Sequence, residues 1–188
     1  GRILMLDDMR ECFVVALKLL GYSLNETDPA KLAQAAELLK KQKPLVQTYN
    51  SGDFANLLAA GDVDLAHGYN GQIAKAVAEN PDKLAYVMPK EGGTIWMDSL
   101  CIPAKARNAA AAHQFINFIL QPEISAEIVN AMHYASANGA AKAHIEPAIL
   151  NDAAIYPPDE TVAHCEFIED IGETVTELDK YWTEIKAQ

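Results

Sequence analysis

An aromatic and an acidic side chain lie close together within residues 94–103, which read TIWMDSLCIP. Trp96 and Asp98 are two residues apart, so on a β-strand both side chains point to the same face. This pair is suited to a bound cation, because the carboxylate supplies charge and the indole supplies a negative π-face. The alternative interpretation is a core tryptophan with an aspartate at the end of a strand.

A second acidic pair, Asp8 and Glu11, follows the strand-like residues 2–6 and begins an amphipathic helical pattern. Open α/β sheets bind ligands at the carboxyl ends of their strands, so this pair is a candidate for ligand binding. The same D-x-x-E spacing is typical of a capping box, in which Asp8 accepts from a backbone N–H and Glu11 folds back. Arg10 could neutralise either acid.

Tyr69 ends another strand-like segment, residues 63–69, and precedes Asn70 and Gly71. Its ring could form the wall of a pocket at the same edge of the sheet. The alternative is an ordinary buried tyrosine whose hydroxyl is hydrogen-bonded.

Nucleophiles and metal ligands do not fall into a known catalytic pattern. The five histidines lack metal-binding spacing, and the three cysteines form neither a C-x-x-C pair nor a disulfide framework. The sequence contains no G-x-S-x-G elbow and no glycine-rich nucleotide loop. We therefore expect no metal, no other cofactor and no catalysis; a small hydrolase using Cys101 or Ser99 with a histidine is the enzymatic alternative.

Apolar periodicity and turn residues predict the elements that position these side chains. Strands are expected at residues 2–6, 43–49, 63–69, 84–89 and 94–103. Helices are expected at residues 9–20, 29–41, 51–61, 70–79, 109–120, 122–132 and 170–186. Strands that alternate with helices indicate an α/β fold with a mainly parallel sheet.

Composition describes a globular chain of 188 residues, half of them hydrophobic, with a formal net charge of -11. Nucleic acid is an improbable partner at this charge, whereas a cationic ligand would meet a favourable field. The longest apolar runs are far shorter than the roughly 18 residues that a membrane span needs. The chain begins directly on a strand-like run, which suggests a mature fragment.

Seven motifs in a fixed order resemble the spermidine/putrescine-binding proteins of bacterial ABC importers, over essentially the whole chain. They are LDDMRE at 6–11, GDVD at 61–64, YNG at 69–71, PKEGG at 89–93, WMD at 96–98, INFILQP at 116–122 and IYPP at 155–158.

The resemblance implies a type II periplasmic binding fold, with two lobes joined by crossover strands and ligand held between them. Residues 1–95 would form the second lobe, 96–164 a returning segment of the first lobe, and 165–188 a C-terminal helix packing back on the second lobe. The N-terminal segment of the first lobe would be missing. The implied location is periplasmic, and the implied partners are a polyamine, a membrane permease and that missing segment.

By motif position, the resemblance also assigns six ligand-binding residues. Asp8, Glu11 and Asp98 would bind ammonium groups, Tyr69 and Trp96 would form aromatic walls, and Tyr134 would add a ring or hydroxyl contact. Three residues depart from the family pattern. Tyr69 stands where members carry Trp, Gln72 where putrescine-preferring members carry an acid, and Ile168 where a spermidine binder has a polar side chain. A sensor of the same fold for another cationic metabolite is the alternative among binding proteins.

Overall fold

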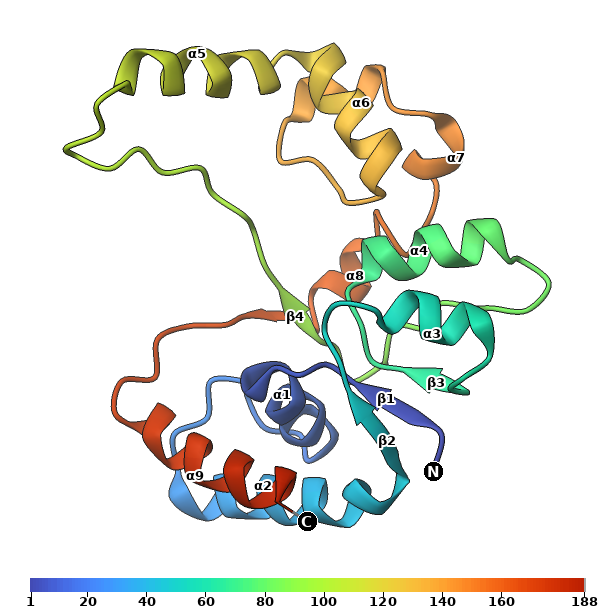
Figure 1. The fold of residues 1–188 in the computed structure, drawn as a ribbon, viewed down its shortest axis with the longest axis vertical. Helices are drawn as coiled ribbons and strands as arrows, with labels where there is room; N and C mark the ends of the chain where they lie inside the picture. Colours follow the sequence, from blue (N-terminus) through green and yellow to red (C-terminus); the bar gives the residue numbers. More distant parts are fainter. Residues whose placement is uncertain (188) are drawn as a thin grey trace.

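The computed structural model describes residues 1–187 and has a small parallel sheet near its centre (Figure 1). The sheet has the order β2-β1-β3, with β1 at Ile3–Met5, β2 at Val46–Tyr49 and β3 at Leu65–Ala66. β1 pairs in parallel with both neighbours, and Leu4 and Met5 are almost fully buried. The predicted parallel α/β arrangement is confirmed.

Helices α1 (Met9–Leu19), α2 (Pro29–Gln42) and α9 (Thr174–Lys186) pack together beside the sheet, at the end of the molecule where both termini lie (Figure 1). Phe13 and Leu17 of α1, Leu32 of α2, and Leu178 and Ile185 of α9 share one buried cluster. The last helix therefore returns to pack on the first two.

A second cluster contains Leu4 of β1. Leu4 packs there with Phe54 of α3 (Phe54–Ala60) and Ile73 of α4 (Asn70–Glu79). A third cluster joins Ala74 of α4 to Val129 of α6 (Pro122–Met132). The short helices of this part are η2 (Gly139–Ala143), α7 (Pro147–Leu150) and α8 (Asp159–Val162), while η1 (Lys43–Leu45) precedes β2.

Two short strands, β4 (Thr94–Ile95) and β5 (Glu166–Phe167), form a separate parallel pair where the chain crosses the molecule. After β4 the chain runs away from the sheet to α5 (Ala109–Ile119), and after β5 it runs to α9 (Figure 1). The chain therefore leaves the sheet through β4 and returns toward α9 through β5.

Several predicted strands are wrong in extent. Residues 84–89 form no strand, and the predicted strand at 94–103 is limited to β4. Val87 is 77% exposed, because residues 84–89 have no neighbouring strand with which to pair. Trp96 is 41% exposed, so the interpretation of a core tryptophan is also wrong. Among residues 1–187, no helix is long and apolar enough to cross a membrane.

Candidate cation-binding site

Asp8 caps the N-terminus of α1 directly after β1. Its Oδ1 accepts a hydrogen bond from the backbone N–H of Glu11 at 3.0 Å, and its backbone is extended. The N-cap prediction for Asp8 is confirmed. The carboxylate also adds negative charge at the positive end of the helix dipole, where an anion is stabilised.

Glu11 does not fold back toward Asp8, so the second half of the predicted capping box is wrong. The side chain is instead 9% exposed, and its Oε2 accepts a hydrogen bond from the Thr94 hydroxyl at 3.0 Å. Burial raises the pKa of Glu11; the hydrogen bond from Thr94 lowers it, and the charge of Asp8 raises it further. The Glu11 carboxyl group therefore lies in a poorly solvated environment next to β4, the first crossover strand.

Arg10 neutralises neither acid by direct contact. Its guanidinium donates to the backbone oxygen of Glu169 and to Oδ1 of Asn25. The charge of Arg10 still lowers the pKa of Glu11, as a smaller effect than burial.

Four aromatic rings form a continuous series of edge-on contacts beside these acids. Ring centroids lie 6.1 Å apart for Phe54 and Tyr69, 6.0 Å for Tyr69 and Trp96, and 5.4 Å for Trp96 and Tyr134. Such edge-to-face geometry is favourable because the positive edge of one ring meets the negative face of the next. The structure thus brings together the three predicted aromatic residues, and Phe54 supports them from α3.

Gly71, in the first turn of α4, allows Tyr134 to pack closely. A Cβ atom at Gly71 would lie 2.7 Å from the Tyr134 ring, well inside van der Waals contact. Sequence reasoning did not identify this contact, although the Asn70-Gly71 pair at a helix start hinted at a close approach.

Electrostatics link the acids to the two tyrosines at either end of the predicted ring series. Burial raises the pKa of Tyr69, and the charges of Glu11 and Asp8 raise it further. Burial also raises the pKa of Tyr134, and the exposed Asp98 adds to this effect. Asp8 and Glu11 thus act electrostatically on Tyr69, and Asp98 acts on Tyr134.

His67 is a further polar group near this region that sequence reasoning did not assign. It follows β3, and its Nδ1 is buried without a hydrogen-bond partner among the described residues. Burial lowers the pKa of His67 to about 4, partly offset by the charge of Asp8. The imidazole is therefore neutral at physiological pH.

Carboxylates at the two ends of an aromatic wall suit an organic cation with separated ammonium groups and an apolar middle. Among residues 1–187, no group of His, Cys, Asp and Glu side chains is arranged to hold a metal ion. Burial raises the pKa of the Cys12 thiol to about 12, and Cys101 is exposed on the segment after β4.

The α/β fold, with a pair of crossover strands beside its sheet, is the fold of a class of solute-binding proteins. A family model described as "Bacterial extracellular solute-binding protein" matches residues 1–157. The chain therefore belongs to this family.

Similar proteins of the same family include polyamine-binding proteins. The chain is 40% identical to the spermidine/putrescine-binding periplasmic protein of Salmonella typhimurium, over 98% of this chain and 53% of the relative. It is 33% identical to a putrescine/cadaverine-binding protein of Pseudomonas aeruginosa, over 100% of this chain and 55% of that protein. The chain spans about half the length of the curated relatives it matches.

Among solved structures, the PotD lipoprotein of Treponema pallidum superposes with a TM-score of 0.85 at 30% identity, covering 100% of this chain and 58% of that one. The predicted type II periplasmic binding fold, the predicted resemblance to polyamine-binding proteins and the predicted periplasmic location are confirmed.

Proposed function

We propose that this chain supplies the acidic and aromatic half of a polyamine site in the binding protein of an ABC importer, with spermidine or putrescine as ligand. The observation that carries the proposal is the series of rings from Tyr69 through Trp96 to Tyr134, with acids at both ends. Binding requires no covalent step, so we propose that the chain is not an enzyme.

The proposed roles follow from the chemistry of each side chain. Asp8, Glu11 and Asp98 would accept charge-assisted hydrogen bonds from ammonium groups, and the rings would cover the methylene chain between them. Two ammonium ends at about 1.5–3 kcal/mol each, with one or two cation–π contacts at about 0.5–2 kcal/mol, give roughly 4–10 kcal/mol. That range corresponds to affinities from about millimolar to tens of nanomolar.

We also propose the two-lobed division stated above. Residues 1–95 form the second lobe, residues 96–164 belong to the first lobe, and residues 165–188 pack back on the second lobe. Support comes from the crossover pair β4–β5, which lies between the sheet and α5. Closure of two lobes around a ligand by a hinge would present a distinct surface to a membrane permease.

The test joins this chain to the part of the Salmonella typhimurium relative that it does not match, and measures the melting temperature of the chimera. Spermidine or putrescine should raise the melting temperature, because a ligand that binds only the folded state stabilises it. Asp98→Ala should abolish the rise, whereas Asp82→Ala, an exposed acid in the turn after α4, should keep it. No response to either polyamine would contradict the proposal, and a response to another amine alone would favour the sensor alternative.

A further inference from the structure

Helix α1 is bonded to both crossover strands. Near its N-terminus, Glu11 accepts from the Thr94 hydroxyl on β4 at 3.0 Å. Near its C-terminus, Lys18 forms an ion pair with Glu166 on β5 at 2.6 Å. Thr94 and Glu166 are direct register partners in the β4–β5 ladder. One helix therefore holds the same pair of strand residues from both of its ends.

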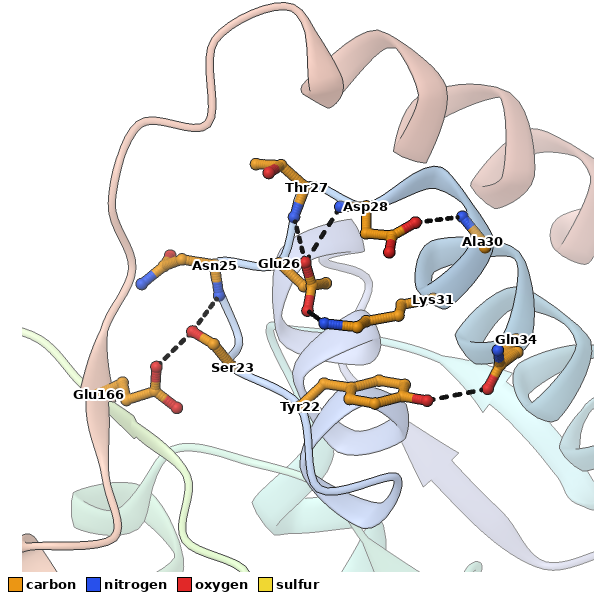
Figure 2. A network of polar contacts seen from close by, with 10 residues as sticks. All are labelled: Tyr22, Ser23, Asn25, Glu26, Thr27, Asp28, Ala30, Lys31, Gln34 and Glu166. Atoms are coloured by element: carbon orange, nitrogen blue, oxygen red, sulfur yellow. Dashed lines mark hydrogen bonds and ion pairs between the residues drawn. The ribbon is translucent and has the colours of Figure 1, made fainter.

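The Glu166 end of this arrangement is supported by the loop that joins α1 to α2. Figure 2 shows the Ser23 hydroxyl donating to the Glu166 carboxylate and accepting from the backbone N–H of Asn25. Asn25 in turn donates from its side chain to the backbone oxygen of Phe167. With β5 fixed to this loop and to Lys18, β4 is held against α1, and the Thr94 hydroxyl stays opposite Glu11.

Thr94 differs from these structural contacts because its partner belongs to the candidate site. Glu11 lies within electrostatic reach of Tyr69, and Thr94 is two residues before Trp96. The hydroxyl bonds to Oε2 of Glu11, and no hydrogen bond to Oε1 is found among the described residues. The hydrogen bond thus connects an acid on one side of the site to the strand that leads into Trp96 and Asp98.

We propose that Thr94 is a positioning residue for the cation site, whose hydroxyl orients the Glu11 carboxylate toward the ligand and joins it to the strand that leads to Trp96. This inference rests on the proposed function, since it assigns Glu11 a ligand.

Removing the hydroxyl should weaken binding for two reasons. Glu11 loses the contact that fixes its rotamer, and its charged form loses a hydrogen bond that offsets burial. The charged and titratable groups around Glu11 are Asp8, Arg10 and Cys12 from α1 and its cap, and Tyr69 from the segment before α4. Without the Thr94 hydrogen bond, only Arg10 opposes the effects of burial and Asp8, so the pKa of Glu11 rises further and its carboxylate is lost at a higher pH.

The first measurement is spermidine affinity by calorimetry, between pH 5.5 and 8, in the chimera described above. Thr94→Val, which keeps the shape of the side chain, should weaken binding roughly tenfold at pH 7, the effect of one hydrogen bond to a charged group. The loss of affinity on acidification should also begin at a higher pH. Thr94→Ser should restore both the affinity and the pH profile, and Thr183→Val, an exposed position on α9, should change neither.

The second measurement follows the Glu11 side-chain carboxyl by NMR in the 188-residue chain without ligand. Thr94→Val should raise the pKa of Glu11, and Thr94→Ser should leave it unchanged. Thr94→Ala replaces Thr94→Val if the valine variant does not fold by circular dichroism. If the unsubstituted chimera binds no polyamine, the proposed function fails, and the NMR titration alone decides whether Thr94 positions Glu11. An unchanged titration and affinity in Thr94→Val, or a serine variant as weak as the valine variant, would overturn the inference.

Discussion

The buried side chain of His67 has a lowered pKa. It lies at the end of β3, with its Nδ1 buried and without a hydrogen-bond partner among the described residues. Burial lowers the pKa of His67 from 6.5 to about 4, because a charged imidazole would be poorly solvated there. The unfolded chain therefore takes up a proton at this histidine before the folded chain does.

The consequence is a loss of stability in mild acid. Above about pH 6.5, protonation of His67 should have little effect on the free energy of unfolding. As the pH drops from about 6.5 toward 4, the unfolded chain binds this proton and the free energy of unfolding should fall. Between pH 7 and pH 5, the unsubstituted chain should lose about 2 kcal/mol more than His67→Gln. Urea unfolding at both pH values measures this difference, with His113→Gln, exposed on α5, as the matched control. Equal losses in the unsubstituted chain and His67→Gln would contradict the assignment.

Single residues could be selected from the sequence where the chemistry of the side chain alone suggests a role. Asp8, Trp96 and Asp98 could be selected because acids and rings at strand ends suit a cation. The hydrogen bond between Thr94 and Glu11 joins positions 83 residues apart, so no local pattern reports it. The packing of Tyr134 on Gly71 is likewise set by how α4 and α6 meet.

Helix α1 combines two roles in one N-cap residue. Asp8 stabilises the helix by accepting from the backbone N–H of Glu11, and it also adds charge next to Tyr69. A neutral side chain that still accepts a hydrogen bond can separate these roles, because serine caps helices about as well as aspartate.

Asp8→Ser should therefore keep the stability of the chain while weakening polyamine binding. Asp8→Ala should lose the cap as well, lowering the free energy of unfolding by about 1 kcal/mol. Urea unfolding and calorimetry on the same two variants check the pair of effects. A serine variant as unstable as the alanine variant would show that the charge, rather than the cap, stabilises α1.

Helices were predicted more accurately than strands because their signals are local. Pro29 after the Asp28 cap, and Gly61 after α3 in a left-handed conformation, mark helix ends within the sequence itself. A strand needs a partner elsewhere in the chain. Residues 84–89 have the composition of a strand, yet no strand pairs with them, so the backbone forms none.

The whole molecule exposes apolar side chains along the segment that follows β4. No residue of α5 is buried, and Phe115 and Phe118 are 57% and 50% exposed. In a monomer, a helix with this many exposed aromatic and aliphatic side chains marks an interaction surface. The relatives are about twice as long as this chain, so residues with no counterpart here are available in them to cover such a surface. The sequence predicted a helix at residues 109–120 but could not show that its apolar side chains are exposed.

We therefore expect α5 to bind the part of the Salmonella typhimurium relative that this chain does not match, when the two are produced as separate polypeptides and mixed. Phe115 and Phe118 still expose about half of their surface, so burying the remainder is worth about 1.5–3 kcal/mol in total, enough to matter in a weak complex. Phe118→Asp should abolish co-elution in size-exclusion chromatography, because it places a charge in the apolar contact. Val87→Asp adds the same charge at a position that is 77% exposed and distant in sequence from α5, and should leave the complex intact. If both variants reduced the complex equally, the loss would be due to added net charge, which is already -11. If no complex formed at all, α5 would not be the surface that binds this segment.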